Sequence, residues 1–368
     1  ARIPLSVPDR PADRIGRFPG YVSVVRRELT NDYTSKQLTA AGLKIYTAFD
    51  PQVQRGLTEG RKNILARLKD IGLDPSGEVQ TGALVVDIPT GEIQAVLASR
   101  DDREGFHRVL DARRQIGSLV KPFVVAAAIE EDPRLHAGTL VRDEAVSIRD
   151  ANSNVWAPKN YDKTEQGVVR LETVIASSIN QATVHLGLGL GLDSILDRLN
   201  EYGIPVGPTK PPATILGVSE MSPYQVATRY QGLLNRGYLT PLKAVRAVVD
   251  DAERTLTRRS FQSTCLIEAR ATVQVDHMMR VGAKVGTGRV FGERYREVMA
   301  SKTGTTDDGR DAWFVGADGR RLGVAWVGFD DNRKAGLTGS IAALPLMSDA
   351  FQHVQRTHRS DTLPEGLR

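Results

Sequence analysis

The sequence predicts a mixed α/β fold of the α+β kind. In this fold a five-stranded antiparallel sheet is flanked by helices and carries an all-helical subdomain. Three observations predict it. Two strand patterns lie early in the chain, three lie late, and about 200 residues of mostly helical pattern separate the two groups. The simplest topology is therefore one sheet with a helical insertion between its second and third strands.

A small strand-helix unit precedes the sheet. The strand-like run 43–49 leads into Asp50 and Pro51, where Asp can cap a helix and Pro can occupy its first turn. The apolar residues after them fall on one helical face. These are Val53, Leu57, Ile64 and Leu68.

The domain boundary is expected near the glycines of 72–77. Residues 1–75 would form a linker segment with the small strand-helix unit, and residues 76–368 would form the main domain. The opening stretch through Pro19 is rich in Pro, Arg and Asp and has no helical or strand period. Such a stretch is typical of a linker or a cut boundary, so we expect a fragment of a longer protein.

The five strands are predicted from alternation and turn residues. Residues 82–98 indicate a hairpin, because two apolar runs flank the turn Pro89-Thr90-Gly91. The late strands are expected at 299–306, 312–316 and 322–329, joined by turns that contain Asp308-Gly309 and Asp318-Gly319.

The middle of the chain shows helical spacing of its apolar residues. A final helix over 341–353 would return to cover the sheet. The other expected helices lie at 118–129, 171–186, 192–202, 222–235 and 272–281.

Composition excludes several classes of function. The net charge of +5 is spread without a Lys/Arg block, which argues against nucleic acid as a partner. Cys265 is the one cysteine, so no internal disulfide is expected, and we interpret it as a small apolar residue. The six histidines lack zinc-site spacing, so neither a metal nor another cofactor is predicted.

The first chemical motif is Ser118-Leu119-Val120-Lys121, at the predicted start of a helix. The Ser118 oxygen would lie in the positive field of the helix terminus, with Lys121 on the same helical face. A serine hydroxyl is a weak nucleophile that needs a base, and a neutral lysine can act as one. Taken alone, the motif fits equally well a capping serine and a lysine that reaches toward solvent.

The second motif is Ser178-Ile179-Asn180. Ser178 and Asn180 point the same way only from a turn or strand-like backbone, as a loop between two helices would provide. Ser-x-Asn is also a common helix-capping pattern, so this motif has weight only together with the others.

The third motif, Lys302-Thr303-Gly304-Thr305, lies on the third predicted strand. Gly304 would let a bound peptide approach the backbone, and a peptide lying along the strand would gain main-chain hydrogen bonds. Lys302 supplies positive charge, while Thr303 and Thr305 offer hydroxyls to a terminal carboxylate. The alternative is an exposed strand with a hairpin glycine.

Together, the three motifs predict how charge is arranged in the site. The charge of Lys302, together with burial, would lower the pKa of Lys121 and favour its neutral form. The backbone N–H groups of Ser118 and Thr305 are the candidate donors to a developing oxyanion.

The segments around these motifs resemble class A penicillin-binding proteins, particularly the one-b type of Gram-negative bacteria. Residues 114–123 read Arg-Gln-Ile-Gly-Ser-Leu-Val-Lys-Pro-Phe, which is similar to the nucleophile segment of that family. Further similar segments lie at 43–51, 156–161, 167–171, 176–180 and 286–288. At 107–109 this chain has His-Arg-Val where relatives often have Asn-Arg-Ala.

The resemblance implies the penicillin-binding transpeptidase fold and a D,D-transpeptidase that forms an acyl-enzyme on Ser118. Ser178 would relay a proton to the departing amine, and Asn180 would hold the donor peptide. Trp156 could line the cleft, although an ordinary loop anchor is the favoured role. The substrates would be peptidoglycan stem peptides, and β-lactams would inhibit the enzyme covalently.

The resemblance also implies features of a longer protein. These are a glycosyltransferase domain, a membrane anchor, an outer-membrane lipoprotein activator, and a place at the periplasmic face of the inner membrane.

Two other functions stay open at this point. The first is hydrolysis by a D,D-carboxypeptidase. A class A β-lactamase is disfavoured because neither Glu201 nor Glu220 is followed by Asn four residues later, as its water-activating motif requires. The second is a penicillin-binding sensor module without turnover, which could keep all of these side chains.

Overall fold

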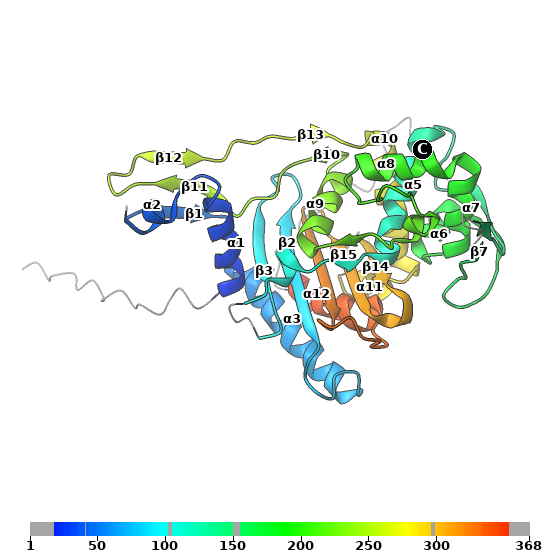
Figure 1. Ribbon diagram of the computed structural model, residues 1–368, viewed down its shortest axis with the longest axis horizontal. Helices are drawn as coiled ribbons and strands as arrows, with labels where there is room; N and C mark the ends of the chain where they lie inside the picture. Colours follow the sequence, from blue (N-terminus) through cyan, green and yellow to red (C-terminus); the bar gives the residue numbers. More distant parts are fainter. Residues whose placement is uncertain (1–17, 41, 102–104, 150–154, 296–298, 353–368) are drawn as a thin grey trace, which may run out of the picture.

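The computed structural model describes residues 18–40, 42–101, 105–149, 155–295 and 299–352. Its centre is the predicted five-stranded antiparallel sheet, in the order β14-β15-β16-β2-β3 (Figure 1). The early hairpin therefore pairs with the late strands through β16 and β2. The strands are β2 Gln80–Asp87, β3 Ile93–Leu97, β14 Ala300–Thr305, β15 Asp311–Ala317 and β16 Arg321–Gly328.

Turn residues set the two hairpins as the sequence predicts. The carboxylate of Asp87 accepts hydrogen bonds from the N–H and hydroxyl of Thr90 at 3.2 and 2.7 Å, which closes the β2-β3 turn. The carboxylate of Asp318 accepts from the N–H groups of Arg320 and Arg321 at 2.7 and 2.6 Å, which closes the β15-β16 turn. Short polar side chains of this kind favour turns because they bond their own backbone.

Helices cover both faces of the sheet, because alternate strand residues are apolar on both sides. On one face, α3 Pro51–Asp70 packs against α12 Leu344–Gln352 and buries Leu57 and Leu68 with Phe314. The opposite face, which includes Trp313 and Trp326, packs against α5 Lys121–Glu131, α9 Pro223–Leu234 and α10 Ala269–Val285. The predicted layering is confirmed.

The N-terminal strand-helix unit forms with an unexpected partner. The Asp50 carboxylate caps α3 by accepting from the N–H groups of Gln52 and Val53 at 2.9 and 3.2 Å, as predicted. β1 Lys44–Thr47, however, pairs with β11 Val245–Val249, which in turn pairs with β12 Thr255–Arg258. The sequence did not indicate this three-stranded sheet, which lies apart from the helical subdomain in Figure 1.

One predicted helix is wrong. Residues 171–186 are not continuous but divide into α6 Leu171–Ala176 and α7 Asn180–Leu190. Ser178 between them has φ +60°, and the Ile179 N–H donates to the Val174 carbonyl at 3.0 Å. This six-residue closure with a left-handed residue is a standard helix ending.

The other helices begin and end within a few residues of prediction. The 118–129 helix starts as a 3-10 turn, Gly117–Val120, and continues as α5, while 272–281 is the middle of α10. α8 spans Leu192–Glu201, and a π-helical turn, Gly339–Ala343, precedes α12. His353 and residues 1–17 lie outside the described residues.

The remaining elements are short. The strand pairs are β4–β9, β5–β8, β6–β7 and β10–β13. The helices are α1 Pro19–Leu29, α2 Ser35–Ala40, α4 Arg108–Asp111 and α11 Arg289–Tyr295, with a 3-10 turn at Pro212–Leu216. The strands are β4 Arg114–Gln115, β5 Leu140–Asp143, β6 Ile148–Arg149, β7 Val155–Trp156, β8 Gly167–Arg170, β9 Glu220–Met221, β10 Tyr238–Leu239 and β13 Thr264–Cys265.

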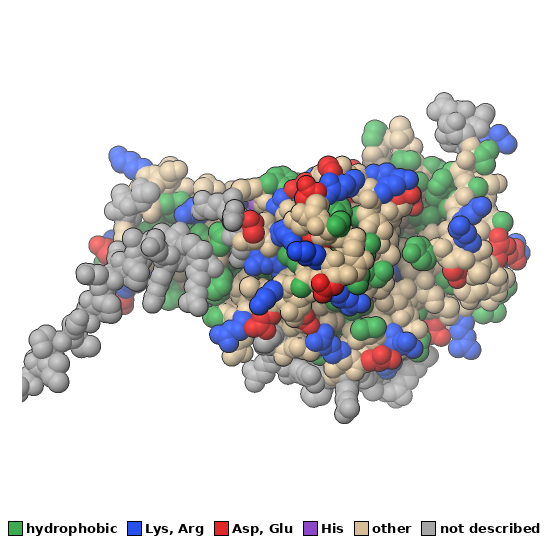
Figure 2. All heavy atoms as spheres, turned by 90° about the horizontal axis from the view of Figure 1, so that it is seen from below, with side chains coloured by type: hydrophobic (Ala, Val, Ile, Leu, Met, Phe, Trp, Pro, Cys, Tyr) green, Lys and Arg blue, Asp and Glu red, His purple; other side chains and the backbone are tan. Residues whose placement is uncertain are grey.

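The surface fits the even charge distribution read from the sequence. On the face seen in Figure 2, Lys and Arg side chains are interspersed with Asp and Glu. Cys265, interpreted as a small apolar residue, is exposed on β13 and so adds nothing to the core. Within the described ranges, no helix has both the length and the apolar character needed to cross a membrane.

Candidate active site

The first motif lies against the third because of a glycine. Gly117 has φ +51° and donates its N–H to the Gly217 carbonyl at 2.8 Å. A Cβ at this position would lie 2.7 Å from the Thr305 carbonyl oxygen, so only glycine allows so close an approach of the two backbones. Ser118, the next residue, is half-buried and faces the space beside Thr305.

Both motif lysines converge on the second motif. Lys121 Nζ donates to Asn180 Oδ1 at 2.7 Å, to Ser178 Oγ at 3.3 Å, and to the Ser178 carbonyl. Lys302 Nζ donates to Ser178 Oγ at 2.8 Å and to the Thr303 carbonyl at 2.9 Å. The left-handed backbone of Ser178 thus presents its hydroxyl and its carbonyl to these two ammonium groups.

These lysines are buried without a counter-charge. Lys121 is 0 % exposed and Lys302 is 1 % exposed, and neither forms an ion pair with any carboxylate in the described part of the chain. Burial holds the pKa of Lys121 well below its ordinary value, and the charge of Lys302 lowers it further, while Asp143 opposes the shift. Burial also lowers the pKa of Lys302 to about 7. The predicted direction for Lys121 and its causes are present in the structure.

Lys121 does not bond directly to the candidate nucleophile. Its hydrogen bonds all run to Ser178 and Asn180, and none of those among the described residues runs to Ser118. Catalytic hydrogen bonds commonly tighten only when substrate is bound. Ser178 Oγ, which both lysines contact, is the group that connects them.

Asn160 and Asp143 support the second motif from behind. Asn160 Oδ1 accepts from the N–H groups of Asn180 and Gln181, each at 3.0 Å, at the start of α7. Asn160 Nδ2 donates to Asp143 Oδ1 at 2.7 Å. Sequence reasoning missed Asp143. The signal that could have found it is the alternation of β5, which buries Asp143 on the same face as Val141.

A cleft of about 710 Å³ runs between the three motifs. Three predicted site residues do not line this cleft, namely Lys121, Lys302 and Gly304. Trp156 is half-buried on its wall, so the cleft-lining role is the one its position fits, although its backbone also pairs with Ile148. The predicted site residues that line the cleft are Ser118, Trp156, Ser178, Asn180, Thr303 and Thr305.

β14 is an edge strand, and its free edge carries the third motif. The Thr306 N–H donates to the Asp311 carbonyl at 3.2 Å on β15. In an antiparallel ladder alternate residues bond the same neighbour, so the backbone groups of Thr303 and Thr305 face away from β15. This edge is available for strand addition.

The structure gives Gly304 a packing role. A Cβ on Gly304 would lie 2.9 Å from the Ile116 carbonyl, 2.9 Å from Leu119 Cγ and 3.0 Å from Trp313 Cβ. Glycine is therefore required here by the packing of the nucleophile segment onto the sheet. The approach of a bound peptide to this backbone stays a prediction.

Two hydroxyls of the third motif are held by neighbouring loops. Thr303 Oγ1 donates to Thr287 Oγ1 at 2.7 Å, within the segment 286–288 that precedes the motif. Thr305 Oγ1 accepts from the Gly339 N–H at 3.2 Å. These contacts fix the side of β14 that faces the cleft.

Comparison with known proteins agrees with this arrangement. Residues 81–326 match the family model described as the penicillin binding protein transpeptidase domain. The chain belongs to this family. The match runs from β2 to β16 and includes all three motifs.

Among curated proteins, the chain is similar to two named penicillin-binding protein 1B. The Vibrio cholerae protein is 34% identical over 368 residues, covering 99% of this chain and 47% of the relative. The Escherichia coli protein is 31% identical over 354 residues, covering 95% and 42%. These names confirm the predicted resemblance to the one-b type. The chain spans about half the length of the curated relatives it matches.

Solved structures share the fold. Penicillin-binding protein 1A from Haemophilus influenzae superposes with a TM-score of 0.84 at 17% identity, over 94% of this chain and 72% of that one. PonA1 from Mycobacterium tuberculosis, in complex with penicillin V, gives 0.78 at 21% identity, over 94% and 96%. The predicted penicillin-binding transpeptidase fold is thereby confirmed.

Proposed function

We propose that this chain is a serine D,D-transpeptidase that cross-links peptidoglycan stem peptides through an acyl-enzyme on Ser118. The observation that carries the proposal is the convergence of Lys121 and Lys302, both buried and unpaired, on Ser178 beside the Ser118 cleft. Lysines with strongly lowered pKa values next to a cleft are typical of sites for proton transfer. Membership of the transpeptidase family supports the same conclusion.

In the acylation step, Ser118 Oγ attacks the penultimate D-alanine carbonyl of the donor peptide. Neutral Lys121 takes the hydroxyl proton as general base. The N–H groups of Ser118 and Thr305 stabilise the oxyanion, at about 3 kcal/mol for each donor. As the C–N bond breaks, Ser178 passes a proton to the departing amine, and D-alanine leaves with the nitrogen.

In the second step, an amine of a neighbouring stem peptide attacks the Ser118 ester. The new amide bond forms, the Ser118–acyl bond breaks, and the proton released by the amine returns through the same groups to Ser118 Oγ. The acceptor in Gram-negative members of the resembled family is meso-diaminopimelate, which we carry over as part of the proposal.

Substrate would bind along β14. A donor peptide added to its free edge gains the unpaired backbone groups of Thr303 and Thr305. Lys302 in its charged form, with the two threonine hydroxyls, would hold the terminal carboxylate. Asn180 and Trp156 would contact the peptide from the opposite wall of the cleft. β-Lactams would acylate Ser118 in the same position.

The two alternatives differ from the transpeptidase only in the fate of the acyl-enzyme. A D,D-carboxypeptidase resolves the acyl-enzyme with water, and a sensor module does not resolve it. An assay with a donor stem peptide and a second stem peptide as acceptor separates them, because only the transpeptidase forms a cross-linked product. A glycosyltransferase domain, a membrane anchor, a lipoprotein activator and a periplasmic location are further parts of the proposal for the whole protein.

The test of the nucleophile is intact-protein mass spectrometry after incubation with benzylpenicillin, followed by peptide mapping. We expect a stable adduct on Ser118 and none on the Ser118→Ala variant. An adduct on another residue would refute the assignment. No adduct on folded protein, with penicillin lost from solution, would instead show a rapid hydrolase; no adduct with penicillin intact would refute acylation.

A further inference from the structure

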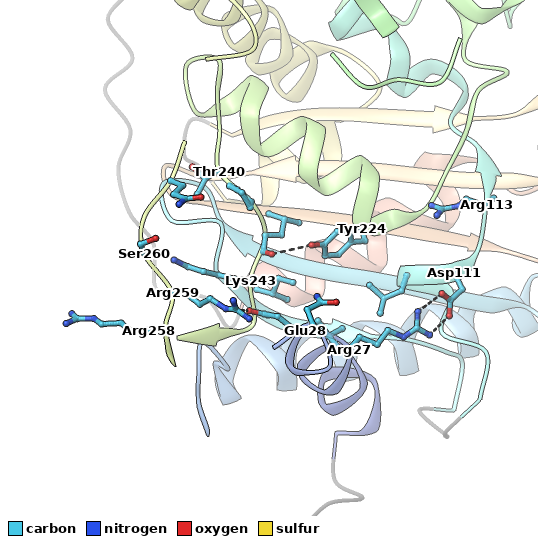
Figure 3. A pocket seen from close by; sticks show the side chains of 17 residues that line it. Arg27, Glu28, Asp111, Arg113, Tyr224, Thr240, Lys243, Arg258, Arg259 and Ser260 are labelled. Carbon is cyan, nitrogen blue, oxygen red and sulfur yellow. Dashed lines mark hydrogen bonds and ion pairs between the residues drawn. The ribbon is translucent and has the colours of Figure 1, made fainter. Parts of the chain in front are cut away.

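A second pocket, of about 730 Å³, lies away from the catalytic motifs (Figure 3). α1, the segment 240–243 and the segment 258–262 supply most of its walls. It shares no lining residue with the catalytic cleft. The function proposed above makes no use of it.

The charges around this pocket are unbalanced. Five cationic side chains line it against two carboxylates, Glu28 and Asp111. The cationic residues are Arg27, Arg113, Lys243, Arg258 and Arg259.

Both carboxylates are already committed within the protein. Asp111 holds Arg27 through two hydrogen bonds of 2.6 Å. Glu28 accepts from the N–H groups of Ala244 and Val245 at 2.7 and 3.2 Å, and from Arg259 at 3.2 Å. Neither acid is therefore free to neutralise another cation.

Three cations remain without an acidic partner. Lys243 is half-buried and Arg258 is exposed, and in the described structure neither side chain forms an ion pair or a hydrogen bond. Among the described residues, Arg113 donates to the neutral amide of Gln225 and to no carboxylate. Figure 3 shows Arg113 and Arg258 at opposite ends of the group of lining residues, with the Arg258 side chain directed outward.

A buried hydroxyl also lacks a partner. Thr240 is 2 % exposed and lines the pocket, and its Oγ1 makes no hydrogen bond. Its backbone N–H is bonded to Gln231 at 2.8 Å, so the position of the residue is fixed. A buried polar group without a partner is costly and indicates a missing bonding partner.

We propose that this pocket binds an acidic peptide segment, whose carboxylates pair with Lys243, Arg258 and Arg113. The walls between these cations are apolar and suit a peptide side chain; they include Val24, Leu110, Leu242 and the ring of Tyr224. β12 is the edge strand of its sheet, so its free backbone groups can bond an extended chain. These two features favour a peptide over an isolated phosphate, which needs neither.

Binding of the peptide would connect two parts of the fold. Lys243 is joined to the β2-β3 hairpin by two backbone hydrogen bonds, from its N–H to Gly91 in the turn and from Ile93 N–H of β3 to its carbonyl, at 2.9 and 2.8 Å. Arg258 belongs to the sheet that contains β1. A peptide held by both residues links the three-stranded sheet of β1, β11 and β12 to the central five-stranded sheet.

The test is fluorescence anisotropy of the intact chain with a labelled six-residue peptide of alternating Glu and Leu. The test variant is the triple substitution Arg113→Gln, Lys243→Gln and Arg258→Gln. The control is Lys62→Gln, which replaces an exposed cation of α3 that does not line the pocket. We expect the triple variant to bind about tenfold more weakly and the control to bind as the unaltered chain does.

Altered peptides test which chemical groups of the ligand are needed for binding. The peptide with Gln in place of Glu is expected not to bind, and the one with Ser in place of Leu to bind about fivefold more weakly. Equal binding by the triple variant, or an equal loss in the control, would overturn the proposal. Displacement of the peptide by an equimolar amount of pyrophosphate would overturn it in favour of a phosphate site.

Discussion

The catalytic cleft and the basic pocket use positive charge in opposite ways. Behind the cleft wall, Lys121 and Lys302 are buried, form no ion pair with a carboxylate of the described residues and have lowered pKa values. At the pocket, Arg27 is largely exposed and bonded to Asp111, which raises the pKa of its guanidinium. The first environment lets amines exchange protons at a lower pH than ordinary lysines, and the second keeps its arginines charged.

The two regions also differ in how much they lower the stability of the fold. An unpaired buried ammonium group lowers stability, whereas an exposed ion pair changes it little. Ser178 adds a left-handed backbone that non-glycine residues seldom adopt. Strain and buried charge meet at one place in the cleft, as expected where function rather than stability selects the residues.

The largest effect is expected from removing the proposed base. Lys121→Met keeps the volume of the buried side chain but cannot accept a proton, so the rate of acylation by benzylpenicillin should fall about a thousandfold. The rate is measured by stopped-flow competition with a fluorescent penicillin. Lys62→Met is the matched control on the surface of α3. Near-normal acylation by the Lys121 variant would remove Lys121 from the mechanism.

A smaller effect is expected on stability from the other lysine. Lys302 has a pKa of about 7 in the folded protein and about 10.5 when unfolded, so the unfolded chain binds more protons between these values. Stability of the unaltered chain should therefore rise with pH from about 7 to about 10.5. At pH 6 the free energy of unfolding of Lys302→Met should exceed that of the unaltered chain by about 3 kcal/mol. This difference should disappear near pH 10.5. Urea titrations at both pH values measure this; a gain equal at both would contradict it.

The pH profile of acylation separates the two lysines. The rate should rise as Lys121 loses its proton and fall near pH 7 as Lys302 loses its charge, which gives a bell-shaped curve. In Lys302→Met the alkaline fall should vanish. The acid limb should move to higher pH, because the variant lacks the charge that lowers the pKa of Lys121. An unmoved acid limb would show that the two groups are not coupled.

The smallest effect is expected at the pocket. Arg27→Gln removes one exposed ion pair, so the free energy of unfolding should fall by less than about 1 kcal/mol and acylation should not change. Thermal unfolding at low and high salt measures this, and salt should reduce the difference. A loss as large as that of a buried pair would erase the contrast between the two regions.

Much of the fold follows from local patterns in the sequence. Alternation with turn residues predicts the two hairpins, and the Asp50 cap with its apolar stripe predicts α3. The motif residues are found because their order and flanking segments are specific. The boundary between residues 75 and 76 stays a prediction, although α3 packs on the sheet with α12.

Features missed by the sequence depend on distant contacts. Apolar spacing continues through Ser178, so it predicted one helix over 171–186, whereas the second motif itself indicated the loop between two helices that the structure has. The Ser178 hydroxyl is bonded by Lys121 and Lys302, which are distant in the sequence. The partner of β1 lies about 200 residues later, where no periodic pattern indicates it. The packing role of Gly304 was not predicted, because the atoms that exclude a side chain there come from the nucleophile segment and from Trp313 of β15.

The most direct test of the account is the titration of the two lysines themselves, by NMR of the chain labelled with 13C at the lysine Cε. Lys121→Met and Lys302→Met assign the signals. We predict two lysines that titrate below the others, with Lys302 near pH 7 and Lys121 well below its ordinary range. Two signals that titrate with the surface lysines near pH 10.5 would contradict the claim that burial prepares these amines for proton transfer.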